Sequence, residues 1–438
     1  SMFKTLRDAF KVKEIRLGLL FTFFVLIVVR LGSLIPVPGL NTVAIKEYLE
    51  SALGDANSFL SSFTGGSFTQ MSIFALNVTP YITSSIIIQL LTIAIPALEE
   101  MQKDGEDGRK KITAITRYVT IFLAVVESLG LVIGFGRGHY MTVTGPLGYI
   151  LVIVTLTTGS AFVMWLGERV TEKGVGNGIS IILLINIVSR MPSDFSDLYV
   201  KFMKGQDIVD MVIAGAIILA VILITTILVV LLQGGVRKIP VQHAQKVQGR
   251  RMMGGQQSHI PLKVNTSSVI PVIFASSILS VPMVIINLFN INTTGVWAKI
   301  LRGMNSNYWF NPAYPWASIG LIIYILLVVF FAYFYTSVTF NPMEVANNLK
   351  KSGGFIPGIR PGKPTQDYLN KILNYIVFIG AVGLLIVAII PIFFNGMFGA
   401  DVSFGGTSLI IIVGVVLETL DQIESKMIVR NYSGFLND

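Results

Sequence analysis

The chain has 438 residues, of which 53% are hydrophobic and only 13% are charged, and its formal net charge is +9. Because soluble domains carry about 25% charged residues, this composition excludes an ordinary soluble globular protein. The chain contains no cysteine, which excludes a disulfide framework, a thiol nucleophile and a cysteine-based metal site.

Ten apolar segments follow one another along the chain, and most approach the roughly 20 residues that a helix needs to cross a bilayer. They are Leu17–Pro36, Val78–Ile95, Ile112–Phe135, Leu147–Leu166, Gly178–Ser189, Val209–Leu232, Val269–Leu288, Ala317–Thr339, Leu373–Phe394 and Thr407–Ile423. Alternating segments of about ten residues, which are typical of a membrane β-barrel, are absent from the sequence. We therefore predict an all-α polytopic membrane protein with ten transmembrane helices.

The basic residues predict which way the chain faces. With an even number of crossings, both ends of the chain lie on one side of the membrane. That side holds 25 of the 33 Lys and Arg residues. The positive-inside rule then places both termini in the cytoplasm.

Residues 62–82, "SFTGGSFTQMSIFALNVTPYI", are more polar than their neighbours. A helix from Thr64 to Leu76 would rise only about 20 Å, short of the hydrocarbon core of roughly 30 Å. Thr79 and Pro80 then suit the N-cap and the first position of a second helix. The sequence predicts a re-entrant half-helix here, and the residues alone leave open whether it moves or only packs.

Two predicted cytoplasmic connections are too long to be simple links. The sixth connection has alternating apolar residues at Ile260, Leu262 and Val264 beside a Gly-rich basic tip, which predicts a projecting β-hairpin. The eighth is rich in Pro and Gly and carries Arg360 within "IPGIRPG". This density of Pro and Gly predicts a rigid, non-helical loop.

Six motifs occur in order along the chain, and together they make it resemble the SecY family, the channel subunits of the bacterial protein-conducting translocon. The motifs are "FTGGSFTQMSIFALNVTPYITSSIIIQLL" (63–91), "DGEDGRKKIT" (104–113), "WLGERVTEKGVGNGISIILL" (165–184), "VIPVIFASSILSVP" (269–282), "GGFIPGIRPGKPT" (353–365) and "FGGTSLIIIVGV" (404–415). The resemblance covers essentially the whole chain.

The resemblance implies two five-helix halves, related as an inverted pseudo-repeat, around a central hourglass pore. Residues 1–190 would hold helices 1–5 with a plug at about 63–76. Residues 191–438 would hold helices 6–10 with cytoplasmic loops at about 234–266 and 340–370.

The resemblance also implies roles for particular residues, which fall into four groups. The aliphatic pore ring is Val78, Ile82, Ile86, Ile179, Leu183, Ile273 and Ile411, where Val78 and Leu183 depart mildly from the Ile that the family favours. The plug includes Gly65, Gly66, Phe68, Met71 and Ile73. The lateral gate includes Thr83, Ser84, Ser85, Gln89, Glu127, Ser276, Ser277 and Val281. The docking sites for SecA or a ribosome are Arg250, Arg251 and Arg360.

Glu127 departs from the family, which commonly has a neutral Gln in this region. An ionisable residue inside a membrane span is a functional hypothesis by default. A hydrogen bond at the gate, a harmless carboxyl facing a cavity and a proton-coupled role all remain open.

The function implied is a non-enzymatic channel in the bacterial inner membrane. It would pass unfolded polypeptide and, when a signal sequence parts the gate, release hydrophobic helices sideways into lipid. The implied partners are SecE, SecG, the SecA ATPase and the ribosome. No cofactor, metal, catalytic residue or DNA contact is expected. The alternatives are a secondary transporter with broken helices and a non-conducting membrane scaffold.

Overall fold

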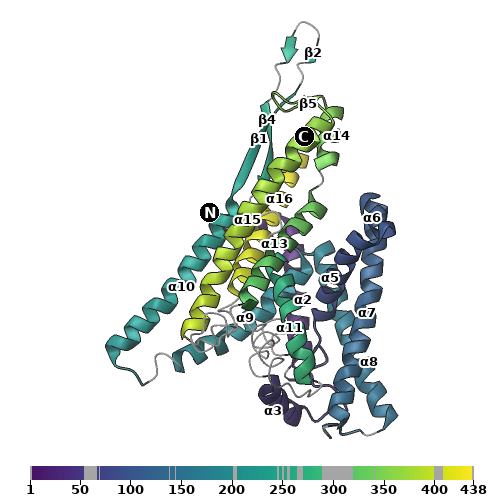
Figure 1. The fold of residues 1–438 in the computed structure, drawn as a ribbon, viewed down its shortest axis with the longest axis vertical. Helices are drawn as coiled ribbons and strands as arrows, with labels where there is room; N and C mark the ends of the chain where they lie inside the picture. The colour runs from purple at the N-terminus through teal and green to yellow at the C-terminus, as the bar shows by residue number, and fades with distance from the viewer. Residues whose placement is uncertain are drawn as a thin grey trace.

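A computed structural model describes residues 2–53, 67–68, 70–137, 139–143, 145–200, 205–243, 246–248, 251–253, 257–263, 270–288, 319–340, 342–398 and 408–436. Within these ranges the protein is a bundle of long helices with a β-hairpin projecting from one end (Figure 1).

Each of the ten predicted spans coincides with a helix of the structure. These helices are α2 (Lys13–Gly32), α5 (Thr79–Ala94), α7 (Glu106–Arg137), α8 (Pro146–Lys173), α9 (Gly178–Leu198), α10 (Ile208–Gly234), α11 (Ile270–Leu288), α13 (Ile319–Thr339), α15 (Lys363–Phe398) and α16 (Ser408–Leu436). Among the described residues, six helical stretches are long and apolar enough to cross a membrane, and Gly178–Pro192 and Ile270–Leu279 form shorter apolar helices. The all-α membrane fold is confirmed, while the count of ten crossings stays a prediction.

Four shorter helices were not predicted: α1 (Met2–Lys11), α3 (Thr42–Leu53), α6 (Pro96–Lys103) and α14 (Pro342–Lys351). Of these, α14 corrects the prediction that the eighth connection is wholly non-helical. Pro342 suits the first position of a helix, and the charges of Glu344 in the first turn and Lys350 and Lys351 in the last turn complement the helix dipole. The non-helical part is confined to residues 352–362.

The central core is formed by buried apolar side chains of α2, α5, α8, α9, α10, α11, α13, α15 and α16. Its members include Val29, Ile82, Val163, Leu183, Ile273 and Ile411. A second cluster, the α3-side core, joins α3, α7 and α8 to the chain between α2 and α5. It includes Ile45, Met71, Leu131, Phe135 and Leu156.

The predicted hairpin is confirmed. Strands β1 (Val236–His243) and β4 (Gln257–Lys263) pair antiparallel, with Val236 opposite Lys263 and Gln242 opposite Gln257. The short strands β2 (Lys246–Gln248) and β3 (Arg251–Met253) pair near its tip. Figure 1 shows the hairpin extending well beyond the helices.

The two long connections form one unit. Strand β5 (Gly354–Phe355), from the eighth connection, adds to the outer edge of β1. Beneath it lies the hairpin core, a cluster of buried apolar residues from both connections and the start of α15: Ile239, Leu262, Ile356, Leu369, Ile372 and Ile376. The hairpin and the Arg360 loop are therefore held in a fixed relation.

The two ends of the chain lie toward the same end of the bundle as the hairpin (Figure 1). The first helix packs on the last, and Ala9, Ile15 and Leu19 share a buried cluster with Ile423. An even number of crossings requires this arrangement.

Candidate pore and lateral gate

All seven predicted ring residues meet in the central core. Val78, Ile82, Ile86, Leu183, Ile273 and Ile411 are buried members of that cluster, and the partly buried Ile179 packs against it. They come from four helices, α5, α9, α11 and α16, that are far apart in sequence. The structure therefore places all seven positions in, or against, one buried apolar cluster.

The spacing along α5 explains how one helix supplies three of these side chains. Ile82 and Ile86 are four residues apart and share one face of the helix. Val78 stands at the N-cap, and its carbonyl accepts from the Ile82 amide at 3.0 Å. The prediction that Thr79 caps this helix is wrong by one residue: Thr79 and Pro80 are already helical, and Asn77 supplies the polar side chain at the entry.

Aliphatic side chains give this meeting point a particular chemistry. They offer no hydrogen bond, so a narrow passage lined by them excludes water and ions. They also bind no particular sequence and can repack around a passing chain. Such a constriction can separate two aqueous compartments without selecting a substrate.

The predicted half-helix is wrong for residues 67–68 and 70–76, which form turns and bends, as do residues 77–78 after them. Met71 and Asn77 adopt backbone φ angles of 47° and 48°, in the left-handed region that an α-helix excludes. Gly65 and Gly66 lie outside the described residues. The physical reason is tertiary: the Val37 amide donates to Met71 O and the Ile73 amide donates to Ile35 O, which pairs this segment with the chain that follows α2.

This turn segment also lies between the two cores. Phe68 and Met71 are buried in the α3-side core, whereas Phe74 and Val78 are buried in the central core and Ile73 packs against it. Phe68 and Met71, which the resemblance assigns to the plug, are therefore part of a buried core of the fold.

Two glycines permit this close packing. A Cβ on Gly159 of α8 would lie 1.9 Å from Ile73 O, and a Cβ on Gly32 of α2 would lie 1.9 Å from the ring of Phe74. A larger residue at Gly159 must displace the backbone of the segment, and one at Gly32 must displace the ring of Phe74.

Seven of the eight predicted gate residues belong to two helices in contact, α5 and α11, and the eighth, Glu127, belongs to α7. On α5, the hydroxyl of Thr83 donates to Thr79 O within the helix, and Ser84 donates across to Thr116 O of α7 at 2.8 Å. Ser85 is half-buried, and the buried Oε1 of Gln89 has no hydrogen-bond partner among the described residues. Neither the Thr83 bond nor the Ser84 bond crosses from α5 to α11, which suits a seam that can part.

On the other side of the seam, Ser277 donates to Ile273 O within α11 at 2.8 Å, and Ser276 is half-buried on the same helix. Val281 belongs to the later part of α11, and its side chain lies outside the described part. Glu127 is half-buried on α7. No group of three or more His, Asp or Glu residues that could hold a metal occurs in the described part of the chain.

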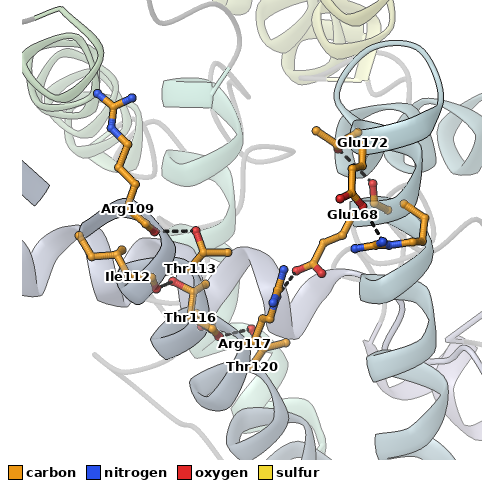
Figure 2. Close-up of polar contacts among 12 residues, drawn as sticks. Arg109, Ile112, Thr113, Thr116, Arg117, Thr120, Glu168 and Glu172 are labelled. Atoms are coloured by element: carbon orange, nitrogen blue, oxygen red, sulfur yellow. Dashed lines mark hydrogen bonds and ion pairs between the residues drawn. The ribbon is translucent and has the colours of Figure 1, made fainter. Parts of the chain in front are cut away.

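An ion pair that the sequence did not single out joins α7 to α8. Arg117 Nε donates to Glu168 Oε1 at 2.7 Å, as Figure 2 shows. The same view shows the hydroxyls of Thr113, Thr116 and Thr120 donating to carbonyls one turn earlier in α7. Arg117 and Glu168 are 51 residues apart in sequence. No local periodicity links them, so the sequence gave no signal for this ion pair.

The predicted docking residues lie on the hairpin unit. Arg360 is exposed in the loop after β5, and its carbonyl accepts from the Thr365 hydroxyl at 2.7 Å. Gly358 and Gly362, on either side, have φ angles of 82° and 98°, which favour glycine and fix the loop's path. Arg251 belongs to β3 near the hairpin tip, and Arg250 lies outside the described residues.

Comparison with known proteins bears on this arrangement. A family model described as SecY matches residues 72–420. The chain is 42% identical over 445 aligned residues to the protein translocase subunit SecY of Bacillus subtilis, covering all of both chains. The chain belongs to the SecY family. It is also 40% identical to the SecY subunit of Thermotoga maritima over 444 residues, covering 99% of this chain and 98% of that one.

Solved structures agree on the SecY fold. One described as "The structure of a protein conducting channel" has a TM-score of 0.62 at 20% identity and covers 95% of this chain and 94% of that one. Sec61 in a canine ribosome-channel complex has a TM-score of 0.58 at 19% identity, with the same coverage.

Proposed function

We propose that this chain is the membrane channel of a protein translocase, through which unfolded polypeptide crosses the bilayer. The observation that carries the proposal is the meeting of seven aliphatic residues from four helices in the central core of a chain that belongs to the SecY family. Its relatives are named protein translocase subunits, and the solved structures of its fold include protein-conducting channels.

In this account the seven residues form the ring that closes the resting channel. Their side chains exclude ions when no substrate is present and yield when a chain passes. In this account the described residues of the turn segment, 67–68 and 70–78, cover the ring from the side of the α3-side core. The burial of Phe74 and Val78 against the central core supports that role.

The seam between α5 and α11 is the proposed lateral exit. The two helices are in contact there, and the hydroxyls of Thr83 and Ser277 bond within their own helices. Parting them breaks few hydrogen bonds, which suits the release of an apolar segment into lipid.

The proposed setting is the bacterial inner membrane, with both termini and the hairpin unit in the cytoplasm. The channel itself is non-enzymatic, so a partner supplies the energy. The exposed Arg360 on a rigid loop and the basic hairpin tip suit docking of SecA or a ribosome, with SecE and SecG completing the complex. A guanidinium on a fixed loop can make paired hydrogen bonds with a carboxylate or phosphate.

The test is transport into vesicles. The chain is reconstituted with SecE and SecG, and a radiolabelled precursor is offered with SecA and ATP. The account predicts protease-protected precursor inside the vesicles and closed membranes without substrate. A secondary transporter would move a small solute and no precursor, and a scaffold would move neither; either result would overturn the proposal.

A further inference from the structure

Three buried polar side chains meet where the chain enters α5. Asn186 Nδ2 of α9 donates to Asn77 Oδ1 at 3.1 Å, and Ser160 Oγ of α8 donates to Asn77 O at 3.2 Å. Asn77 and Asn186 are 0% exposed and Ser160 is 1% exposed. We call these three residues the polar clamp.

Asn77 also shapes the start of α5. Its Oδ1 accepts a second hydrogen bond, from the Val78 backbone amide at 3.0 Å. The backbone amide of Asn77 donates to Phe74 O at 3.0 Å. Its φ of 48° lies in the left-handed region, where Asn is one of the few non-glycine residues tolerated. The residue thus ends the turn segment and orients the first residue of the ring.

Stability alone does not account for the polar clamp. Burying amides in an apolar core is unfavourable unless every polar atom finds a partner. Asn77 Nδ2 is buried and has no hydrogen-bond partner in the described part of the chain. Directional bonds do, however, fix one arrangement of helices, which apolar contacts alone specify less sharply.

The clamp connects the chain just before α5 to α9, and both helices carry ring residues. Asn77 is next to Val78, and Asn186 is three residues after Leu183, so it lies on the same face of α9. We propose that Asn77 and Asn186 are positioning residues for the ring: their hydrogen bond fixes α5 against α9, so that Val78 and Ile82 close onto Ile179 and Leu183. This inference rests on the proposed channel function.

In this proposal the hydrogen bond belongs to the closed arrangement, so its loss shifts the balance toward spontaneous opening. We expect the ratio of open to closed time without substrate to rise about tenfold, equivalent to about 1.4 kcal/mol.

Four variants test the clamp. Asn186→Leu removes the donor at nearly constant size, and Asn77→Gly removes the side chain while keeping the left-handed backbone accessible. Asn77→Asp keeps a carboxyl oxygen that accepts from both Asn186 and Val78. Thr225→Val is the control, because Thr225 is equally buried yet donates only within α10, to Val221 O at 2.8 Å.

Each variant is assembled with SecE and SecG, and two quantities are measured: the open fraction in planar bilayers without substrate and the melting temperature. The inference predicts about a tenfold rise in open-to-closed ratio for Asn186→Leu and Asn77→Gly. Asn77→Asp should keep the parental open-to-closed ratio but melt at a lower temperature, because it buries a carboxyl group, and Thr225→Val should keep both parental values. In Asn186→Leu and Asn77→Gly, a fall in melting temperature with unchanged conductance would assign the clamp a purely structural role and overturn the inference.

Ile273→Asn separates this inference from the function on which it rests. If Ile273→Asn conducts and the clamp variants do not, only the clamp inference fails; if none conducts and the parent transports no precursor, the proposed function fails. Should Asn186→Leu not assemble, Ser160→Ala decides, since it removes a single donor to Asn77 O. A rise in its open fraction supports the clamp, and a parental value contradicts it.

Discussion

Replacing Gly159 by Ala tests whether the turn segment is held tightly against α8. The added Cβ would lie 1.9 Å from Ile73 O, 2.9 Å from Ile73 C and 3.3 Å from Phe74 Cδ1, whereas ordinary contact begins at 3.4 Å. Ile73 cannot simply withdraw, because its amide donates to Ile35 O at 2.9 Å and the neighbouring Phe74 ring already fills the space over Gly32.

Overpacking of this kind destabilises a core by about 1–3 kcal/mol. We therefore expect Gly159→Ala to lower the melting temperature of the purified protein in detergent, followed by size-exclusion chromatography after heating. Because Ile73 and Phe74 pack against the central core, the variant should also conduct more ions without substrate than the parent.

The matched control is Gly234→Ala in the last turn of α10, where a Cβ meets nothing within 4 Å. Here the same chemical change should be neutral or stabilise the helix by roughly 0.5–1 kcal/mol. Equal melting temperatures for the two variants would refute the argument that the segment is fixed by close approach to α8.

Three further predictions address the ring, the loop and the hairpin unit. Ile273→Asn and Ile411→Asn should allow export of precursors with defective signal sequences, because a polar group in the ring retains water; fully blocked export in both would count against the ring. Arg360→Glu should leave assembly with SecE intact and stop SecA-driven export into vesicles, and unchanged export would remove Arg360 from the mechanism. Ile239→Asp, in the hairpin core, should expose the hairpin unit to limited proteolysis while α10 and α15 stay protected, since a buried unpaired carboxylate is strongly unfavourable; a parental digestion pattern would show that the core does not join the two connections.

The features predictable from sequence are those with a local cause. Apolar runs predicted a helix at each of the ten spans because the backbone must satisfy its own hydrogen bonds in lipid. Alternation around Ile260 and Leu262 predicted a hairpin because strand residues face opposite sides in turn. Both patterns need only neighbours in the chain.

The turn segment could not be predicted in this way. Its short length favoured a half-helix, but Met71 and Asn77 take left-handed conformations because of partners more than thirty residues away, at Val37, Ser160 and Asn186. Ser72 and Asn77 make this stretch more polar than its neighbours, yet both are buried. Tertiary contacts, which periodicity cannot show, decided this segment.

The ring residues could be predicted from the sequence only in part. Each of its residues, taken singly, is indistinguishable from an ordinary core aliphatic, and resemblance to the SecY family was needed to select them. The structure brings all seven into contact with one core, and their role in closing the channel stays a prediction.

The central claim is that a polypeptide passes through the ring, and the absence of cysteine from the chain makes it directly testable. A single Cys is placed at Ile86, Ile273 or Ile411, and a control Cys at Leu223, which is 52% exposed on α10. A precursor with one Cys is then arrested in transit, and disulfide formation is measured. The account predicts crosslinks at the three ring positions, only with SecA and ATP present, and none at Leu223. Crosslinking at Leu223 equal to that at the ring, or none at the ring, would contradict it.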